Sequence, residues 1–428
     1  VLPAATPNTF STTGARAAPE RWWTAFGDPQ LNTLIDSALQ RNFDLRVVWE
    51  RLNAARAVVD RESAALIPDL DASLQGGISF PQPDFVGGEN FRLGLTSQYE
   101  VDLWGRIRSA VDAERFRADA TRADFQAAAV TLAAELARAW FQLTEARSQL
   151  GLVAAQVETN EQILDLLEAR FSTGQIRGAD ILRQRQLLQA TREQQVVVEA
   201  RVEILEHQLL VLLGRAPQET LEYRPDSLPA PPPLPATGLP VELVRRRPDI
   251  RSAHFRLQAA DRDLASAISA KYPRLSISAS TSLRSNNFQN LFRDWAYSFA
   301  GNLIAPIFYG GRLRAEVDRT EAEKQQRLYE YGQTVLIAFR EVEDALIQET
   351  KQRERLALLE EQLELARQTN QQLRIQYLNG TSNYLDVLTA LDQEQQLRRD
   401  LLTANLTLLG FRIALYRALA GSFETERS

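Results

Sequence analysis

Apolar residues recur at alternating steps of four and three along the stretch from Arg106 to Phe171. The stretch contains no proline, and its single glycine, Gly151, does not interrupt the pattern. A mean step of about 3.5 residues is typical of a coiled-coil seam, whereas a plain surface helix repeats every 3.6 or so. At about 1.5 Å per residue, this helix would be roughly 100 Å long, so we expect it to pack along other helices. The seam comprises Leu132, Leu136, Ala139, Leu143, Ala146, Leu150, Val153, Val157, Asn160, Leu164, Leu167 and Phe171.

The same pattern returns after a shift of 206 residues. Residues 106–213 align without a gap on the second half of the chain, with Phe171 over Tyr377, Gly174 over Gly380 and Asp180 over Asp386. The segments ahead of the long helices match at an offset of 205, which places Pro68 over Pro273. The second seam comprises Ala338, Val342, Ala345, Leu356, Leu359, Leu363, Ala366, Leu373 and Tyr377. The chain therefore consists of two copies of one structural unit.

These patterns predict the following organisation. Residues 1–43 form an N-terminal extension with a short helix that Asp28 caps, and residues 44–214 form the first repeat, with helices at 44–66, 106–171 and 179–213. A proline-rich linker with a short helix covers 215–248. Residues 249–421 form the second repeat, with helices at 249–271, 312–378 and 384–419, and 422–428 is a tail. The shorter helices should stack end to end, so that together they span what each long helix spans.

Ahead of each long helix the period changes to two. Alternation of apolar and polar residues predicts strands at 70–80 and 91–103 in the first repeat, joined by the loop 81–90, and at 275–284 and 295–308 in the second. Aromatic residues mark their ends: Phe80, Phe91, Trp295, Tyr297, Phe308 and Tyr309. Strands of this length, apolar on one face and aromatic at the ends, are typical of outer-membrane barrels, although a half-buried soluble sheet shows the same alternation.

The number of strands constrains the assembly. Four strands cannot close, and open strand edges are not tolerated in lipid, where unpaired backbone groups cost several kcal/mol each. A membrane barrel therefore requires several chains. Two chains would supply eight strands and a filled interior, whereas three would supply twelve strands and an open bore. The helices would then close into a second cylinder on the same axis.

Composition excludes several other functions. The net charge of −6 provides no basic field for nucleic acid, so no nucleic-acid partner is expected. The absence of cysteine rules out thiolate metal sites and cysteine catalysis, and there is no apolar run of 18 residues that would predict a transmembrane helix. No phosphate-binding loop, HExxH or GxSxG motif is present. His207 and His254 lie far apart in predicted helices. We therefore expect no enzymatic activity and no cofactor or metal.

Four blocks resemble one known family. The first opens at Trp22-Trp23 and runs through Phe26-Gly-Asp-Pro-Gln-Leu31, and the others are Tyr99-Glu-Val-Asp-Leu-Trp-Gly-Arg106, Arg246-Arg-Pro-Asp-Ile250 and Asn383-Tyr-Leu-Asp-Val-Leu388. Their sequence and spacing resemble the OprM-like (NodT-type) outer-membrane efflux proteins of the TolC superfamily. The resemblance covers nearly the whole chain.

The resemblance implies a homotrimer with a twelve-stranded barrel in the outer membrane of a Gram-negative bacterium. The helices would form a long periplasmic tunnel. It implies a passive exit duct for drugs or other small toxic solutes, in a tripartite pump of RND type. The partners would be outer-membrane lipids, a periplasmic membrane-fusion adaptor that grips the tunnel tip, and an inner-membrane transporter that supplies the energy. Many members are lipoproteins acylated on an N-terminal cysteine, which this sequence does not contain, so a lipid anchor is left open.

The candidate sites lie at the tips of the long helices. As the adaptor-contacting residues of the two tips we expect Arg170, Gly174, Asp180, Arg374 and Gly380, with Arg177 as a further candidate for a salt bridge. The glycines permit a tight reversal of the chain, and the aspartates lie where a helix dipole favours an anion.

By resemblance, the second tip forms a closed aperture on the trimer axis. Leu385, Thr389 and Asp392 fall on one helix face, which would become three rings in a trimer, and Tyr377 and Asp386 complete the set. The family often carries an acid where Thr389 stands. Face geometry favours Asp392 as the lining carboxylate and leaves Asp386 to cap the helix, but both assignments stay open.

Two other classes of protein compete with this interpretation. A coiled-coil scaffold with a soluble β-domain would share the long helices, but it would not explain strands with aromatic ends. An adaptor of the same type of pump carries one helical hairpin, whereas this chain carries two in tandem.

Overall fold

The computed structural model describes residues 7–79, 88–223, 227–285, 292–293, 295–421 and 423. The predicted end of the first strand at Phe80, the loop at 81–87 and most of the tail at 422–428 lie outside these residues. The described part divides into two compact units. Unit 1 contains residues 48–125 and 248–335, and unit 2 contains residues 6–47, 126–247 and 336–428. Each unit takes segments from both sequence repeats, so the compact units cut across the repeats.

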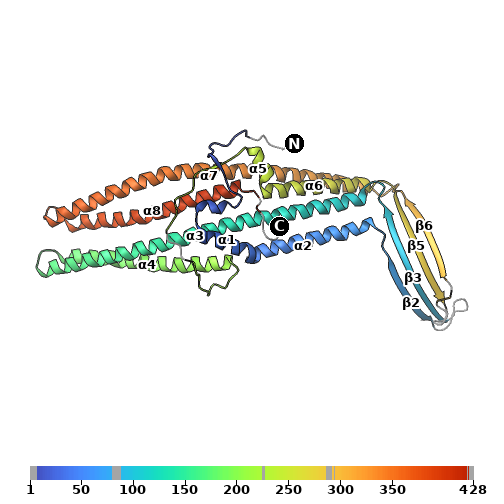
Figure 1. The fold of residues 1–428 in the computed structure, drawn as a ribbon, viewed down its shortest axis with the longest axis horizontal. Coiled ribbons are helices and arrows are strands. Elements are labelled where there is room, and N and C mark those ends of the chain that lie inside the picture. Colours follow the sequence, from blue (N-terminus) through green and yellow to red (C-terminus); the bar gives the residue numbers. More distant parts are fainter. Residues whose placement is uncertain are drawn as a thin grey trace. The chain divides into compact units, whose positions relative to one another are not determined.

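The two longest helices begin and end close to the predicted positions. Helix α3 spans Arg106–Ser172 and α7 spans Arg312–Leu378, with 67 residues in each. Each is followed by a helix that runs back along it, α4 at Gly178–Leu212 and α8 at Tyr384–Leu419 (Figure 1). We call the part of α3 in unit 2 with α4 hairpin 1, and the part of α7 in unit 2 with α8 hairpin 2.

The predicted seams are largely buried inside these hairpins. Leu136, Leu143 and Val153 in α3 are fully buried, as are Ala338 and Val342 in α7, whereas Phe171 at the end of α3 is exposed. In hairpin 2, Leu356 packs with Leu408 of α8. Burying one such side chain contributes about 1.5–3 kcal/mol, so these apolar seams account for much of the cohesion of each hairpin.

The shorter helices surround the long ones. In unit 2, a 3₁₀ helix at Trp22–Phe26 precedes α1 at Pro29–Arg41, and α5 spans Pro240–Arg246. Helix α2 spans Phe43–Ser63, and α6 in unit 1 spans Pro248–Ser269. The predicted helix 44–66 is thus shorter, because its last turn, Ala64–Leu66, tightens to a 3₁₀ helix before Pro68. The N-terminal segment pairs with the linker through the two-residue strands β1 at Arg16–Ala17 and β4 at Pro235–Ala236.

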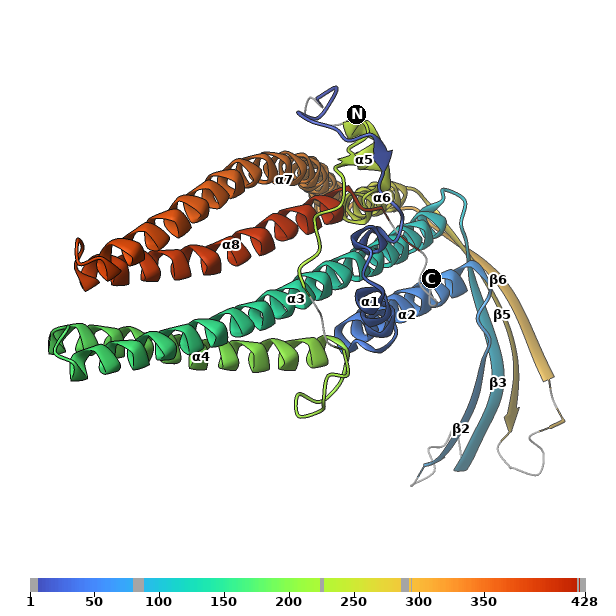
Figure 2. The ribbon, with the colours of Figure 1, turned by 60° about the vertical axis from the view of Figure 1, so that its left-hand side comes forward.

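Unit 1 contains one four-stranded antiparallel sheet in the order β2-β3-β5-β6 (Figure 2). The strands are β2 at Asp71–Ser79, β3 at Gly88–Val101, β5 at Arg274–Ser285 and β6 at Trp295–Ile304. The third predicted strand agrees to within one residue at each end. The predictions of 91–103 and 295–308 were wrong at their ends, because β3 starts three residues earlier and both strands stop before the following helix. Strands β2 and β6 form the two edges, and no other described strand of the chain pairs with their outer sides.

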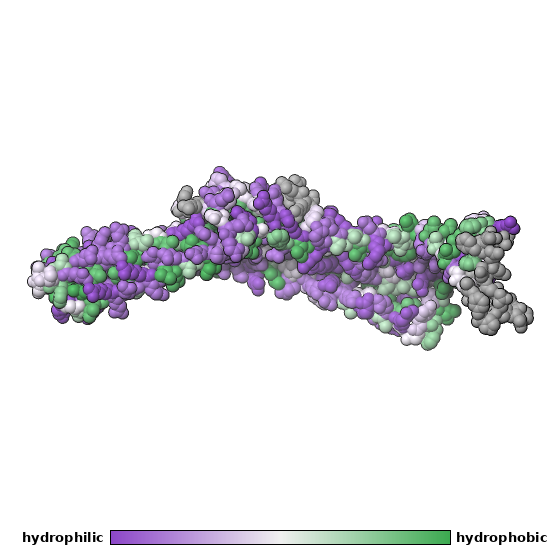
Figure 3. Space-filling model, turned by 90° about the horizontal axis from the view of Figure 1, so that it is seen from below, coloured by the Kyte–Doolittle hydropathy of each residue, from purple (hydrophilic) through white to green (hydrophobic). Residues whose placement is uncertain are grey.

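The register of the sheet places the predicted apolar positions on one face. Leu74, Leu93, Leu283 and Trp295 lie in one row across the four strands, because residues directly opposite in antiparallel strands share a face. The serine-rich positions lie on the other face. Apolar side chains gather over the strands at the right-hand end of Figure 3. The large exposed ones are Leu74, Leu95, Trp295, Tyr297, Phe299 and Leu303.

The block from Tyr99 to Arg106 shapes the passage from strand to helix. Asp102 accepts hydrogen bonds from the backbone N–H groups of Ile107 (3.0 Å) and Arg108 (2.9 Å), which satisfies two donors at the start of α3. Glu100 pairs with Arg106 at 2.9 Å. Gly105 adopts a φ of 75°, which a side chain would disfavour. The block from Tyr99 to Arg106 therefore ends strand β3 and starts the long helix α3.

Asp28 has an analogous role in unit 2. Its Oδ1 accepts hydrogen bonds from the backbone N–H groups of Gln30 (2.9 Å) and Leu31 (3.0 Å), as an N-cap of α1. Its Oδ2 accepts a third from the indole N–H of Trp140 in α3, at 2.7 Å. Trp22, Trp23 and Trp140 are nearly inaccessible to solvent around this contact. Asp28 therefore ties the N-terminal segment to the long helix.

We predict that Asp28→Ala lowers the free energy of unfolding by about 1–3 kcal/mol, because it removes an N-cap and leaves a buried indole N–H unpaired. Thermal unfolding of the detergent-solubilised protein measures the change. The loss of unfolding free energy caused by Trp140→Phe should be smaller in the Asp28→Ala background than in the wild type. Asp36→Ala, which removes an exposed ion pair with Arg21, is the control and should change little. Strict additivity of the two changes would contradict the proposed coupling.

Candidate functional site

Both helical hairpins reverse through the same glycine turn. Gly174 has a φ of 76° and Gly380 a φ of 75°. In hairpin 1 the N–H of Gly174 donates to the carbonyl of Phe171 (2.9 Å), and the next N–H, of Gln175, reaches back to Arg170 (3.0 Å). Gly380 and the residue after it repeat both bonds in hairpin 2. This is the Schellman pattern, in which a glycine in the left-handed region closes the helix end.

Helix α8 begins with a cap that differs from the predicted one. The side chain of Asn383 accepts the backbone N–H of Asp386 at 3.1 Å, so Asn383 is the N-cap. The carboxylate of Asp386 instead accepts the hydroxyl of Ser382 at 2.9 Å. The prediction that Asp386 caps the helix was therefore wrong, because the side chain that accepts the capping hydrogen bond is that of Asn383. An asparagine amide suffices for the cap, and the carboxylate ties down the residue before it.

Leu385, Thr389 and Asp392 share one exposed face of α8. Leu385 is 45% exposed, and Thr389 and Asp392 are exposed as well. In the described part of the chain, Asp392 makes no ion pair or hydrogen bond of its own, although its charge acts on Arg399. This face therefore presents a leucine, a hydroxyl and a carboxylate within two turns of the tip, with no intrachain cover.

A cleft of about 500 Å³ opens between the two tips. It brings together most of the residues predicted for adaptor contact with one residue predicted for the aperture, Tyr377; the former are Arg170, Gly174, Asp180 and Gly380, with Arg177. The guanidinium of Arg170 lies over the ring of Tyr377, 5.6 Å from its centroid. Arg374 does not line the cleft and is exposed, and the face of Leu385 and Asp392 also lies outside it. The predicted tip residues thus fall into two groups, those that line this cleft and those that are exposed outside it.

Asp180 differs from its counterpart in the second repeat. Its side chain is 7% exposed, and Arg183 is its ion-pair partner at 3.5 Å. Asp180 also raises the pKa of the nearby Tyr384 hydroxyl, after the larger effect of burial. The N-cap of α4 is Arg177, which makes no capping bond through its side chain. A buried carboxylate in the first turn of α4 is stabilised by the helix dipole.

Tyr384 makes a contact that was not predicted from the sequence. Its ring packs in an apolar cluster with Leu167 and Ile181 of hairpin 1. Its hydroxyl donates a 2.6 Å hydrogen bond to Oε1 of Gln184 in α4. Burial raises the pKa of this hydroxyl above its ordinary value, so it stays protonated and a donor even in moderately alkaline solution. Tyr384 therefore joins the start of α8 to hairpin 1.

Further polar contacts continue along the line where hairpin 1 meets α8. Nε2 of Gln184 donates to the carbonyl of Asn160 (2.9 Å), and Nε2 of Gln395 donates to Oδ1 of the same residue (3.3 Å). Asn160 was predicted at an apolar seam position, and its polar side chain there was the signal for this contact.

The line extends toward the middle of the hairpins. Gln156 donates to the carbonyl of Gln395 (3.1 Å), Gln149 donates to the carbonyl of Arg399 (2.8 Å), and Thr403 donates to the buried Glu145 (3.1 Å). We call this set the polar seam: Glu145, Gln149, Gln156, Asn160 and Gln184 of hairpin 1 with Tyr384, Gln395, Arg399 and Thr403 of α8. Hydrogen bonds thus join the hairpins along the polar seam, and the apolar cluster around Tyr384 joins them at the tip.

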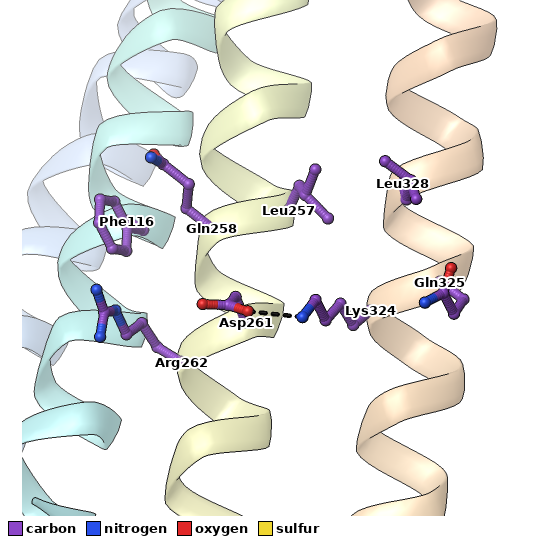
Figure 4. Close-up of a pocket in the computed structure, with 8 residues that line it drawn as sticks. All are labelled: Phe116, Leu257, Gln258, Asp261, Arg262, Lys324, Gln325 and Leu328. Atoms are coloured by element: carbon purple, nitrogen blue, oxygen red, sulfur yellow. Dashed lines mark ion pairs between the residues drawn. The ribbon is translucent and has the colours of Figure 1, made fainter. Parts of the chain in front are cut away.

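Unit 1 carries a separate cleft of about 290 Å³ (Figure 4). Its lining comes from α3, α6 and α7. Phe116, Leu257 and Leu328 contribute apolar surface, and Asp261 pairs with Lys324 at 2.8 Å. The hydrogen bond to Asp261 raises the pKa of Lys324. The two charges therefore neutralise each other, and nothing in this arrangement indicates catalysis.

The described residues offer neither a metal site nor a membrane-spanning helix. Among the described residues, no group of three or more His, Cys, Asp or Glu side chains could hold a metal ion. His207 and His254 lie on the exposed surfaces of α4 and α6. Burial lowers the pKa of His254, so it is neutral at pH 7. No helix in the described ranges is both long and apolar enough to cross a membrane.

Comparison with known proteins identifies the family. The model of the family "Outer membrane efflux protein" matches residues 34–215 and again residues 239–421. The chain belongs to the outer membrane efflux protein family. The double match coincides with the two copies in the sequence, and family membership excludes the scaffold and the adaptor as alternatives. As a member of this family, the protein is an efflux protein of the outer membrane and not an enzyme.

Relatives are similar along almost the whole chain. The pyoverdine export outer membrane protein OpmQ of Pseudomonas aeruginosa is 31% identical over 430 residues, which cover 95% of this chain and 88% of OpmQ. Among solved structures, the outer-membrane channel OprN is 32% identical with a TM-score of 0.88 and 99% of each chain covered. The open state of the MtrE outer membrane channel of Neisseria gonorrhoeae is 26% identical with a TM-score of 0.88, covering 98% of this chain and 96% of MtrE. The efflux protein therefore has the fold of TolC-family outer-membrane channels.

The glycine turns provide a direct test of the tip geometry. We predict that Gly174→Ala and Gly380→Ala each destabilise the protein by about 1 kcal/mol, because alanine disfavours a positive φ. No atom would lie within 4 Å of the added methyl group at either site, so the cost comes from the backbone alone.

Gly151→Ala is the matched control. Gly151 is helical and equally open to a methyl group, so alanine there should stabilise by about 0.5–1 kcal/mol. Thermal unfolding together with hydrogen exchange at the tips measures all three variants. If all three variants changed the stability in the same direction, the assignment of the two glycine turns would be contradicted.

Proposed function

We propose that this efflux protein is the exit duct of a tripartite pump, and that three copies close into one channel with a gate at the periplasmic tip. The observation that carries the proposal is the four-stranded sheet, which has an apolar face, a polar face and two unpaired edges. In lipid those edges must be paired, and a second copy of the same sheet can pair them. Three copies give twelve strands around an open bore.

The helical repeats support the same closure. Within one chain, α3 pairs with α8 through the polar seam. Shifted by 206 residues, α3 corresponds to α7 and α8 corresponds to α4. The equivalent faces of α7 and α4 are uncovered in the single chain: Ile347 and Leu358 on α7 and Val197 and Ile204 on α4 are more than half exposed. If α7 of one copy contacts α4 of the next, every copy repeats the contact that already exists inside it.

The charges on these faces are complementary. Gln149 and Arg399, which are in contact within the chain, correspond to Arg355 and Glu193. Within the described ranges, neither Arg355 nor Glu193 makes an ion pair. The proposed contact between copies therefore places a guanidinium opposite a carboxylate at the position where the intrachain contact places a glutamine opposite a backbone carbonyl.

The gate is proposed to lie at the start of α8. In a trimer, the uncovered face of Leu385, Thr389 and Asp392 would form three rings around the axis. A leucine ring excludes water, and a ring of carboxylates repels itself and attracts cations. Tyr377 and Asp386 support this face, Tyr377 through its contact with Tyr384 and Asp386 through the hydrogen bond that it accepts from Ser382.

The partners follow from this arrangement. No motif for ATP hydrolysis occurs in the sequence, so the energy comes from an inner-membrane transporter. A periplasmic adaptor would contact the tips around Arg170, Gly174, Asp180, Arg374 and Gly380 and favour the open state. OpmQ is named for pyoverdine export and CusC of Escherichia coli for cation efflux, so a shared duct serves different solutes in these relatives. We therefore assign substrate choice to the transporter.

We predict that the double variant Leu385→Ser/Asp392→Ala increases single-channel conductance in planar bilayers, because it removes both the apolar ring and the carboxylate ring. Leu182→Ser is the control, since Leu182 is even more exposed than Leu385 but lies on α4. An unchanged conductance in the double variant would reject this face as the aperture.

Charge reversal tests the contact between copies. Arg355→Glu or Glu193→Arg alone should weaken an SDS-resistant trimer in unboiled gels, and the double reversal should restore it. An exposed ion pair contributes about 0.2–1 kcal/mol, and a like-charge pair opposes association by a similar amount at each of three interfaces.

Arg185→Glu is the matched control for the charge reversal, because the partner of Arg185 is Glu168 of the same chain. It should leave the trimer intact. If both single reversals gave trimers as stable as the wild type, the interface would lie elsewhere. A wild-type protein that is monomeric and soluble without detergent would overturn the channel itself.

A further inference from the structure

Two arginines stand directly opposite each other on the polar face of the sheet. The register pairs Arg92 of β3 with Arg284 of β5, and the next neighbour across β2 is Gln75. Opposite residues in antiparallel strands have Cβ atoms about 4.5–5.5 Å apart, and like charges in this position destabilise a sheet. Both side chains are exposed, and neither makes an ion pair with any described residue. A guanidinium stays charged at every physiological pH, so the repulsion is permanent.

The surrounding polar face does not neutralise this pair. The rows next to it hold Ser73, Gly94 and Ser282 and then Asp71, Thr96 and Ser280. Asp71 lies four residues along β2 from Gln75, which is about 13 Å at 3.3 Å per residue. Glu100, nearer the helices, is already paired with Arg106. Positive charge is therefore concentrated at one end of the polar face.

The topology determines which end this is. The helices of unit 1 join the sheet where β3 ends at Val101 and where β5 begins at Arg274. Arg92 lies near the start of β3 and Arg284 near the end of β5, so both lie at the end of the sheet remote from the helices. In a channel whose apolar face contacts lipid, the polar face lines the bore, and its end remote from the helices is the outer mouth.

We propose that Arg92 and Arg284 form a positively charged collar at the outer mouth of the channel, which favours anions, including solutes with carboxylate or phosphate groups. The inference rests on the trimeric channel proposed above. Three copies supply six guanidinium groups around one water-filled opening with low-dielectric walls, and such a geometry concentrates counter-ions. Arginine pairs also bind carboxylates and phosphates through two parallel hydrogen bonds.

The measurement is the reversal potential of purified channels in planar bilayers under a KCl gradient. It is made in the wild type and in the Leu385→Ser/Asp392→Ala background, so that carboxylates at the tip do not mask the mouth. Arg92→Gln/Arg284→Gln should shift the reversal potential toward cation preference. Arg92→Lys/Arg284→Lys, which keeps the charge, should retain the wild-type value.

Two controls separate local from global effects. Arg21→Gln/Arg61→Gln removes the same number of charges away from the sheet and should leave the reversal potential unchanged. Because the Gln variants relieve repulsion, their melting temperature should stay the same or rise. An unchanged reversal potential in Arg92→Gln/Arg284→Gln, or a lowered melting temperature, would overturn the collar. A wild-type protein that forms no conducting channel would instead reject the proposed function.

Discussion

The structure depends first on the apolar seam that runs along each long helix at alternating steps of three and four. Val153 in α3 and Val342 in α7 are fully buried on such seams, and the returning helices α4 and α8 cover them. A helix of 67 residues has no single globular core to pack on, so its stability must come from a partner along its length. The hairpin is therefore the smallest element of unit 2 that can hold itself together, and the glycine turns, caps and short helices are arranged around it.

The duplication of this hairpin bears on how copies of the chain could assemble. A face that is satisfied within the chain, where α3 contacts α8, has an uncovered equivalent on α7 and on α4. The sheet has the same property, because its inner strands are paired and its edge strands are not. Both parts of the molecule thus have one unmet contact on each side, and the proposed closure of several copies around an axis would satisfy both.

Much of this could be predicted from the sequence, because periodicity reports which face of an element is buried. The long helices, the four strands and the glycine turns all follow from spacing and from backbone preferences. Element ends were less predictable: 91–103 shifted to Gly88–Val101 because local pairing, not alternation, sets where a strand stops. The role of Asn383 was missed because asparagine and aspartate are nearly equivalent as caps, and only the geometry distinguishes Asn383 from Asp386. Tyr384 and Gln184 are 200 residues apart, so no local pattern could pair them.

The polar seam has a consequence for how such a molecule can change shape without coming apart. Separating two apolar surfaces in water exposes them at about 25 cal/mol per Å², which would resist any movement of one hairpin against the other. Separating glutamine, asparagine and threonine side chains exchanges protein hydrogen bonds for bonds to water, at a net cost of only about 0.5–1.5 kcal/mol each. In the proposed channel, hairpin 2 could therefore move along the polar seam as one body while its own apolar seam stays closed. Water in a filled tunnel can satisfy the groups of the polar seam, whereas the apolar cluster of Tyr384 and Val387 with Leu167 and Ile181 at the tip resists separation.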